Sequence, residues 1–67
     1  MSLSIIIPVY NEEVQIKITL NKLNNFKKKF RNLEIIFVDD FSSDSTKNII
    51  KRYCERKKFI KIVKNTK

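Results

Sequence analysis

The fold of this chain of 67 residues is decided by the stretch Ile35-Ile36-Phe37-Val38-Asp39-Asp40-Phe41-Ser42-Ser43-Asp44-Ser45-Thr46. Its first part is an apolar run without alternation, which is typical of a strand that is covered on both faces in a parallel sheet. The run stops at two adjacent carboxylates, and small polar residues that commonly cap helices follow. A buried parallel strand that ends in this way brings polar groups to a cleft, so we expect a ligand to bind here.

The residues before this stretch predict another strand and a helix. Residues 4–10 form a second β-branched run, whose regular pairing should end near Pro8, because proline has no N–H to donate. Asn11 is a candidate N-cap for the helix. The apolar positions of residues 14–30 fit two periods: a strand period through Val14, Ile16, Ile18 and Leu20, and a helix period through Ile16, Leu20, Leu23 and Phe30. Length and the absence of Gly and Pro favour the helix.

A second helix and a third strand complete the predicted order. Residues 46–56 carry an apolar helical stripe, and residues 59–63 form a short, less uniformly apolar strand. Because crossovers between parallel strands are right-handed, we predict an α/β fold with a three-stranded parallel βαβαβ sheet, strand order 3-2-1 and helices packed on it. This order leaves residues 4–10 at an open edge, which favours aggregation. We therefore expect more strands to follow, and residues 1–67 to be a single partial domain.

Composition limits the classes of function. The chain has 15 Lys and Arg against 7 Asp and Glu, a net charge of +8, which favours phosphates, nucleic acid or an anionic membrane surface. Abundant Ile, Lys and Asn and the complete absence of Gly indicate a general compositional bias instead, so we expect no nucleic-acid partner. The single cysteine, Cys54, predicts a reducing, cytoplasmic setting. Residues 4–9 are too short to span a bilayer, and residues 1–3 lack the charged start and the cleavage site of a signal peptide.

Two sets of residues should meet at the carboxyl edge of the sheet, where open parallel sheets bind ligands. They are Pro8, Val9, Tyr10, Asn11 and Glu12 after the first strand, and Asp39, Asp40, Phe41 and Ser42 after the second. A tyrosine can stack on a flat ring, and a carboxylate can accept hydrogen bonds from a base or a ribose. This combination fits a nucleotide, although no Gly-rich phosphate loop is present. Each residue also has a structural explanation: Asp39 can brace the loop, Asp44 can cap a helix and Tyr10 can pack.

These residues resemble the family 2 glycosyltransferases with the GT-A fold. The resemblance lies in residues 4–13, in Ile16, Leu20 and Leu23, and in residues 34–46, and it covers essentially the whole chain. It implies part of a GT-A, Rossmann-like sheet with a site for a nucleotide-diphosphate-sugar donor. By the resemblance, the donor-binding positions are Pro8, Val9 and Tyr10 along the base, Glu12 near the nucleotide, Asp40 in contact with the base, and Asp39 as its more structural partner.

The chain departs from the family pattern in two ways. Phe41 and Ser45 stand where the family usually or often has Gly, so a loop that needs positive φ there would be strained. The family's Asp-x-Asp metal motif, acceptor region and catalytic base belong to sequence that follows Lys67. The resemblance thus implies the amino-terminal, donor-binding part of an enzyme that transfers a sugar to an acceptor hydroxyl. It implies Mg²⁺ or Mn²⁺ only in the complete enzyme, no catalytic or metal-binding residue in this chain, and no activity of the chain alone.

Two further expectations concern partners and place. The remainder of the domain, or a second copy of the chain, should cover the edge of the first strand, and the protein should be cytoplasmic or at the cytosolic face of a membrane. Two other classes of function stay open. A receiver-like module would bind Mg²⁺ at Asp39-Asp40, but receivers normally carry this pair after their first strand. A basic module for nucleic acid or membrane surfaces would use the lysines, which are scattered over both helices rather than interleaved with aromatic residues on one face.

Overall fold

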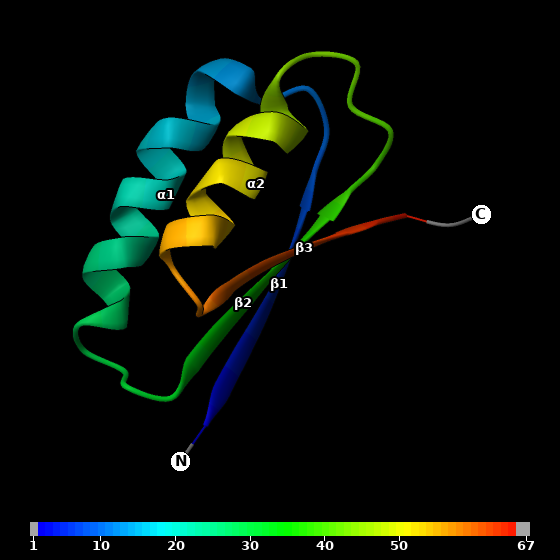
Figure 1. The fold of residues 1–67 in the computed structure, drawn as a ribbon. Coiled ribbons are helices and arrows are strands. Elements are labelled where there is room, and N and C mark those ends of the chain that lie inside the picture. The colour runs from blue at the N-terminus through cyan, green and yellow to red at the C-terminus, as the bar shows by residue number, and fades with distance from the viewer. Residues whose placement is uncertain (1, 66–67) are drawn as a thin grey trace.

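The computed structural model describes residues 2–65 and confirms the predicted order of elements (Figure 1). The elements are β1 (Leu3–Val9), α1 (Glu13–Lys27), β2 (Leu33–Asp39), α2 (Thr46–Arg56) and β3 (Ile60–Lys64). The three strands form one parallel sheet in the order β1-β2-β3, as predicted. The register aligns Val9, Asp39 and Lys64 in one row at the carboxyl edge. None of the helices within residues 2–65 is long and apolar enough to cross a membrane.

Strand β1 lies at the edge of the sheet, which explains how it accommodates Pro8. The N–H of Leu3 donates to the carbonyl of Asn32, and the carbonyl of Val9 accepts from the N–H of Asp40. The odd-numbered residues of β1 therefore direct their backbone groups toward β2. The backbone nitrogen of Pro8 points to the open edge, where no hydrogen bond to β2 is lost. The strand ends one residue later, close to the predicted point.

Helix α1 settles the ambiguous periodicity in favour of the helix. Ile16 and Leu20 are buried, whereas Val14 of the alternating set is 88% exposed. The predicted helix extended too far, since α1 ends at Lys27 and Phe30 lies beyond it. The Phe30 ring packs against the Phe26 ring with 4.7 Å between ring centroids. This contact explains why an apolar residue at position 30 continues the helical pattern although it lies beyond the end of α1.

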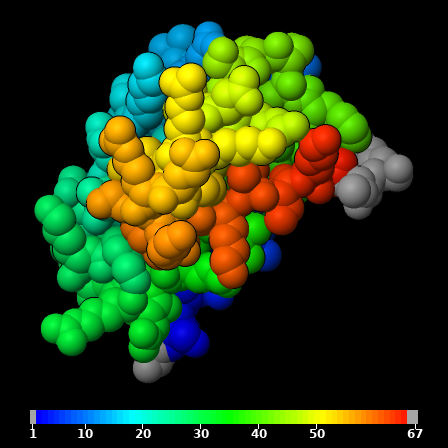
Figure 2. All heavy atoms as spheres, viewed as in Figure 1, coloured from blue at the N-terminus to red at the C-terminus, as the bar shows by residue number. Residues whose placement is uncertain are grey.

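The hydrophobic core lies between the two helices and one face of the sheet. Its largest fully buried side chains include Ile35 and Phe37 from β2, Ile16 and Leu20 from α1, and Ile50 from α2. Both helices cover this same face (Figure 1). The space-filling view in Figure 2 shows α2 (yellow to orange) beside β3 (orange-red) at the front of the molecule, where the two elements are in contact.

The other face of the sheet is open, so the prediction that the strands are covered on both faces was wrong for this chain. We call it the open apolar face, and its apolar residues are Ile6, Pro8, Ile36, Val38 and Val63. Ile6 is 66% exposed, and a Glu34–Lys61 ion pair of 2.8 Å lies on the same face. The strand order runs in one direction without reversal, and right-handed crossovers then place both helices on one side.

Candidate ligand site at the carboxyl edge

The loop after β2 folds back onto the turn after β1. The N–H of Asn11 donates to Oγ of Ser42 at 3.0 Å, and the N–H of Ser43 donates to Oδ1 of Asn11 at 2.7 Å. The structure therefore joins the two segments that the sequence placed at this edge. Asn11 makes this connection. It has a positive φ of 46°, and its side-chain oxygen accepts a hydrogen bond from the loop after β2. Asn11 does not cap α1, so the predicted N-cap was wrong: the N-cap residue is Glu12.

The first turns of the two helices are also tied to each other. The N–H of Glu13 donates to Oδ2 of Asp44 at 3.2 Å, and the N–H of Ser45 donates to Oε1 of Glu13 at 3.0 Å. The N–H of Glu12 donates to the hydroxyl of Thr46 at 2.8 Å. The first N–H groups of a helix have no partner within it. The N–H groups of Glu12 and Glu13 thus bond to the segment before α2, and the N–H of Ser45 bonds back to Glu13, so these contacts hold the two helix starts together.

Asp44 has a structural role, but not that of the helix cap suggested from the sequence, because the N-cap residue of α2 is Ser45. Its Oδ1 accepts hydrogen bonds from the N–H and the hydroxyl of Thr46, which is completely buried. The hydrogen bond from the Thr46 hydroxyl, assisted by the N–H groups of Thr46 and Glu13, holds the pKa of the Asp44 carboxyl below its ordinary value. Asp44 is thus an ionised brace of the loop.

The two adjacent carboxylates at the end of β2 have different surroundings. Asp39 is 4% exposed, and its Oδ1 has no hydrogen-bond partner among the described residues. Asp40 is half-buried, and its Oδ1 accepts a hydrogen bond of 3.0 Å from the side-chain amide of Asn65. A buried polar atom without a partner costs about 1–3 kcal/mol. Asp39 therefore presents an acceptor that no other group of residues 2–65 uses.

A cavity of about 200 Å³ lies beside Asp39. It is lined by Asp39, Phe41, Ser42, Lys47 and Lys64. The sequence analysis missed both lysines as site residues. Lys64 reaches the cavity because its position in β3 pairs with Asp39, and that register depends on tertiary structure. Lys47 stands in the first turn of α2, and the positive charges of Lys51 and then Lys64 lower the pKa of its ammonium group.

The other predicted site residues differ in how accessible they are. Tyr10 is 59% exposed at the end of β1, and Pro8 and Glu12 are also exposed. The side chain of Val9 is buried in the core, so a ligand cannot reach it. Phe41 is exposed and has a φ of 58°, a left-handed conformation that glycine would adopt without strain. Ser45, in contrast, has a φ of −83° and needs no glycine.

Asp39 and Asp40 are not part of a larger cluster of metal-ligating side chains within residues 2–65. The described residues contain no group of three or more His, Cys, Asp or Glu side chains that can hold an ion. Asp40 is engaged by Asn65, and two lysines border the cavity on the side of Asp39. Divalent hard cations require several oxygen ligands, and neighbouring ammonium groups repel them. The donor set at this edge therefore does not fit Mg²⁺ or Mn²⁺.

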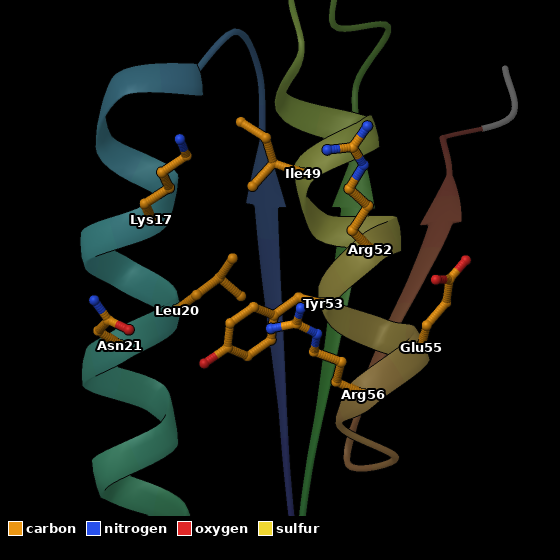
Figure 3. A pocket seen from close by; sticks show the side chains of 8 residues that line it. All are labelled: Lys17, Leu20, Asn21, Ile49, Arg52, Tyr53, Glu55 and Arg56. Carbon is orange, nitrogen blue, oxygen red and sulfur yellow. The ribbon is translucent and has the colours of Figure 1, made fainter.

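A larger groove of about 600 Å³ lies between the two helices, away from the predicted site residues (Figure 3). Its apolar part consists of Leu20, Ile49 and Tyr53. Its cationic groups are Lys17 from α1 and Arg52 and Arg56 from α2, whose side chains extend at the helix surfaces in Figure 3. The groove joins basic groups of both helices on one surface, which the sequence analysis did not expect.

Comparisons with known proteins define the class of this chain. Residues 4–67 match the model of the family described as Glycosyl transferase family 2, so the chain belongs to the family 2 glycosyltransferases. It is 45% identical over 60 residues to the probable glycosyltransferase YdaM of Bacillus subtilis, an alignment that covers 90% of this chain and 14% of that protein.

Two solved structures share its fold. One is the mannosyltransferase PcManGT of Pyrobaculum calidifontis in complex with GDP-Man and Mn²⁺, with a TM-score of 0.77 and 28% identity. The other is residues 1–349 of TarS from S. aureus, with a TM-score of 0.78 and 34% identity. Each match covers 97% of this chain and 19% of the other. The chain thus spans less than a fifth of the length of these relatives.

Proposed function

We propose that this chain is the amino-terminal part of a GT-A glycosyltransferase domain, and that it binds the nucleotide of a nucleotide-diphosphate-sugar donor. The observation that carries the proposal is the cavity at the carboxyl edge, beside the unpartnered, buried Oδ1 of Asp39. Open parallel sheets bind ligands at this edge. Family membership supports the same site, as does the GDP-Man bound by PcManGT.

The roles that we propose for the site residues follow from their exposure. The Tyr10 ring is accessible for stacking on a base, while Pro8 precedes it in β1 and Glu12 follows it at the N-cap of α1. Val9 contributes through the backbone, since its carbonyl accepts the N–H of Asp40 and so fixes that residue. Asp40 is the proposed contact of the base, with Asn65 orienting its carboxylate. Asp39 supplies the buried acceptor next to it.

In the complete enzyme we propose transfer of a sugar to an acceptor hydroxyl. A divalent ion, Mg²⁺ or Mn²⁺, would stabilise the leaving diphosphate, as the Mn²⁺ in the PcManGT complex suggests. Because residues 2–65 contain no fitting metal site, we expect this chain to bind the nucleotide but not to turn over the donor. Turnover by the chain alone with a donor sugar, Mn²⁺ and an acceptor would contradict this assignment.

We propose that another part of the polypeptide, or a second copy of the chain, covers the β1 edge and the open apolar face. An unpaired edge strand and an exposed apolar sheet face are both sites of association in soluble proteins. We further propose that the protein works in the cytoplasm or at the cytosolic face of a membrane. Fractionation of cells that produce the tagged chain tests this location, and recovery of the chain outside both the cytosolic and the membrane fractions would contradict it.

Direct titration tests the donor site. We expect uridine or guanosine diphosphate to bind in isothermal titration calorimetry at constant salt, and Asp40→Asn to weaken this binding. The matched control is Glu55→Gln, which also removes one carboxylate but lies on α2 in the groove between the helices. Binding that is unchanged by Asp40→Asn, or lost equally in both variants, would contradict the proposed contact.

The two other classes of function predict different results. A receiver-like module would be labelled by acetyl phosphate, but its acidic pair must converge on one Mg²⁺, whereas Asp40 is turned toward Asn65. A basic surface-binding module has one specific feature in its favour, the groove with Lys17, Arg52 and Arg56. It would bind unrelated oligonucleotides with an affinity that falls steeply with salt. Nucleotide binding at constant salt that oligonucleotides do not compete for favours the donor site.

A further inference from the structure

Two ammonium groups border the carboxyl-edge cavity, although the donor site as proposed so far does not use them. Lys47 comes from the first turn of α2, and Lys64 is the last residue of β3. Two separate elements therefore bring like charges to one cavity. The charge of Lys51, one helical turn further on, and then that of Lys64 lower the pKa of Lys47. An anion bound between Lys47 and Lys64 would offset the repulsion between these two ammonium groups.

Asp39, the one acidic residue among the described residues that line the cavity, offsets the charge of Lys47 only in part, since the pKa of Lys47 stays below its ordinary value. Within residues 2–65, neither Lys47 nor Lys64 forms an ion pair with Asp39. Its Oδ1 is buried and has no hydrogen-bond partner in that part of the chain. The cavity therefore offers two unpaired cations and one unused acceptor at the same time. A matching ligand carries an anionic group and, close to it, a hydroxyl or N–H that can donate.

The first turn of α2 adds to the preference for an anion. The helix has 11 residues, and its N-terminal end, at Thr46 and Lys47, carries the positive end of the helix dipole. The cavity volume of about 200 Å³ decides how much of a ligand fits. Sites that enclose a whole small molecule measure about 300–1,000 Å³. The cavity therefore fits a phosphate and its neighbouring group, while the rest of the ligand lies outside it.

We propose that Lys47 and Lys64 bind the phosphate of the nucleotide, while Oδ1 of Asp39 accepts a hydrogen bond from a hydroxyl or N–H of the same ligand. The inference rests on the proposed donor site and adds its phosphate-binding residues. It separates two groups of functional residues at the edge. Tyr10 and Asp40 recognise the base, and Lys47 and Lys64 recognise the charge.

The test compares a nucleoside with its diphosphate, for example uridine with uridine diphosphate, by calorimetric titration of the intact chain. We expect Lys47→Gln and Lys64→Gln each to weaken binding of the diphosphate about fivefold, the effect of losing one exposed ion pair. Binding of the nucleoside should change less than twofold. The matched control is Lys58→Gln, which removes the same charge before β3, at the opposite edge of the sheet. It should leave both affinities unchanged. Inorganic pyrophosphate should compete with the diphosphate in the parent chain and less in the lysine variants.

The possible results distinguish this inference from the donor site itself. If the diphosphate binds no more tightly than the nucleoside, or if Lys58→Gln has the same effect as the two site variants, the phosphate assignment is wrong and nucleotide binding stands. If neither ligand binds to a chain that circular dichroism shows to be folded, both the donor site and the phosphate assignment are wrong. If Lys47→Gln and Lys64→Gln weaken binding of the diphosphate but not of the nucleoside, the result supports both the donor site and the phosphate assignment.

Discussion

The backbone N–H of Glu12 donates a hydrogen bond of 2.8 Å to the hydroxyl of Thr46, 34 positions further along the chain. Thr46 is completely buried, and its hydroxyl donates in turn to Asp44. One side chain thus connects the start of α1, the start of α2 and the loop after β2. The carboxyl edge of the sheet keeps its shape through this residue, although Thr46 makes no contact with the proposed ligand cavity.

Thr46→Val should destabilise the chain by about 2 kcal/mol, because it leaves the part-buried N–H of Glu12 without its partner and removes one of the two hydrogen bonds that Oδ1 of Asp44 accepts. Urea denaturation followed by circular dichroism measures this loss. Thr19→Val is the matched control, since its hydroxyl bonds only to the carbonyl of Gln15 on its own helix, and we expect a change below about 0.5 kcal/mol. Equal effects of the two substitutions would show that Thr46 does not connect the two loops.

Phe41→Gly should be more stable than Phe41→Ala by about 1 kcal/mol. Both variants lose the exposed ring, but only glycine adopts the φ of 58° without the strain of about 1–2 kcal/mol that a Cβ imposes, and part of the gain is offset by its greater freedom when unfolded. The urea midpoints of the two variants give the difference. An alanine variant as stable as the glycine variant would show that the loop is not strained at this position.

Asp44 should make the stability of the chain depend on pH in the acid range. Its pKa in the folded chain lies below the ordinary value of 3.8, so the unfolded chain binds the proton more readily. The stabilisation is therefore complete above this value and is lost as the pH falls through the folded-state pKa. Urea unfolding between about pH 2.5 and pH 6 should show a flatter profile for Asp44→Asn than for the parent chain or Glu55→Gln. Parallel profiles of the parent and Asp44→Asn would contradict this account.

Ile6→Glu should reduce self-association without lowering stability. Ile6 stands in the middle of the open apolar face and is 66% exposed, so the charge disfavours contact between sheet faces while the core stays unchanged. Val14→Glu is the control, because it adds the same charge on the exposed surface of α1. Sedimentation velocity over a range of protein concentrations measures the effect. Association that persists in Ile6→Glu, or that both variants abolish equally, would exclude this face as the contact.

The fold followed from the sequence because local patterns determine it. Uninterrupted apolar runs marked β1 and β2, and α2 has the predicted bounds, Thr46–Arg56. The errors have physical reasons. Phe30 extended the helical pattern because it stacks on Phe26 beyond the end of α1. An apolar run also predicts that both faces of a strand are covered, but it does not predict whether residues of the same chain cover them. The open apolar face shows that this chain covers only one.

The candidate site was predicted only in part, for reasons of register and tertiary contact. Asp39, Asp40 and Tyr10 could be placed at the edge because they follow the strand ends directly. The different surroundings of the two carboxylates depend on Asn65, which is distant in sequence. Lys64 enters the site through its pairing with Asp39, and Asn11 bonds to Ser43 across 32 positions. Such contacts appear only when the strands are aligned in space.

The central claim is that a nucleotide binds at the carboxyl edge of the sheet, and NMR of the ¹⁵N-labelled chain tests it most directly. Titration with uridine or guanosine diphosphate should shift the backbone amide signals of Tyr10, Asp40, Phe41, Lys47 and Lys64. The signals of Arg52 and Arg56, in the groove between the helices, should stay in place. Shifts confined to those two arginines and Lys17, or no shifts at millimolar nucleotide, would contradict the donor site.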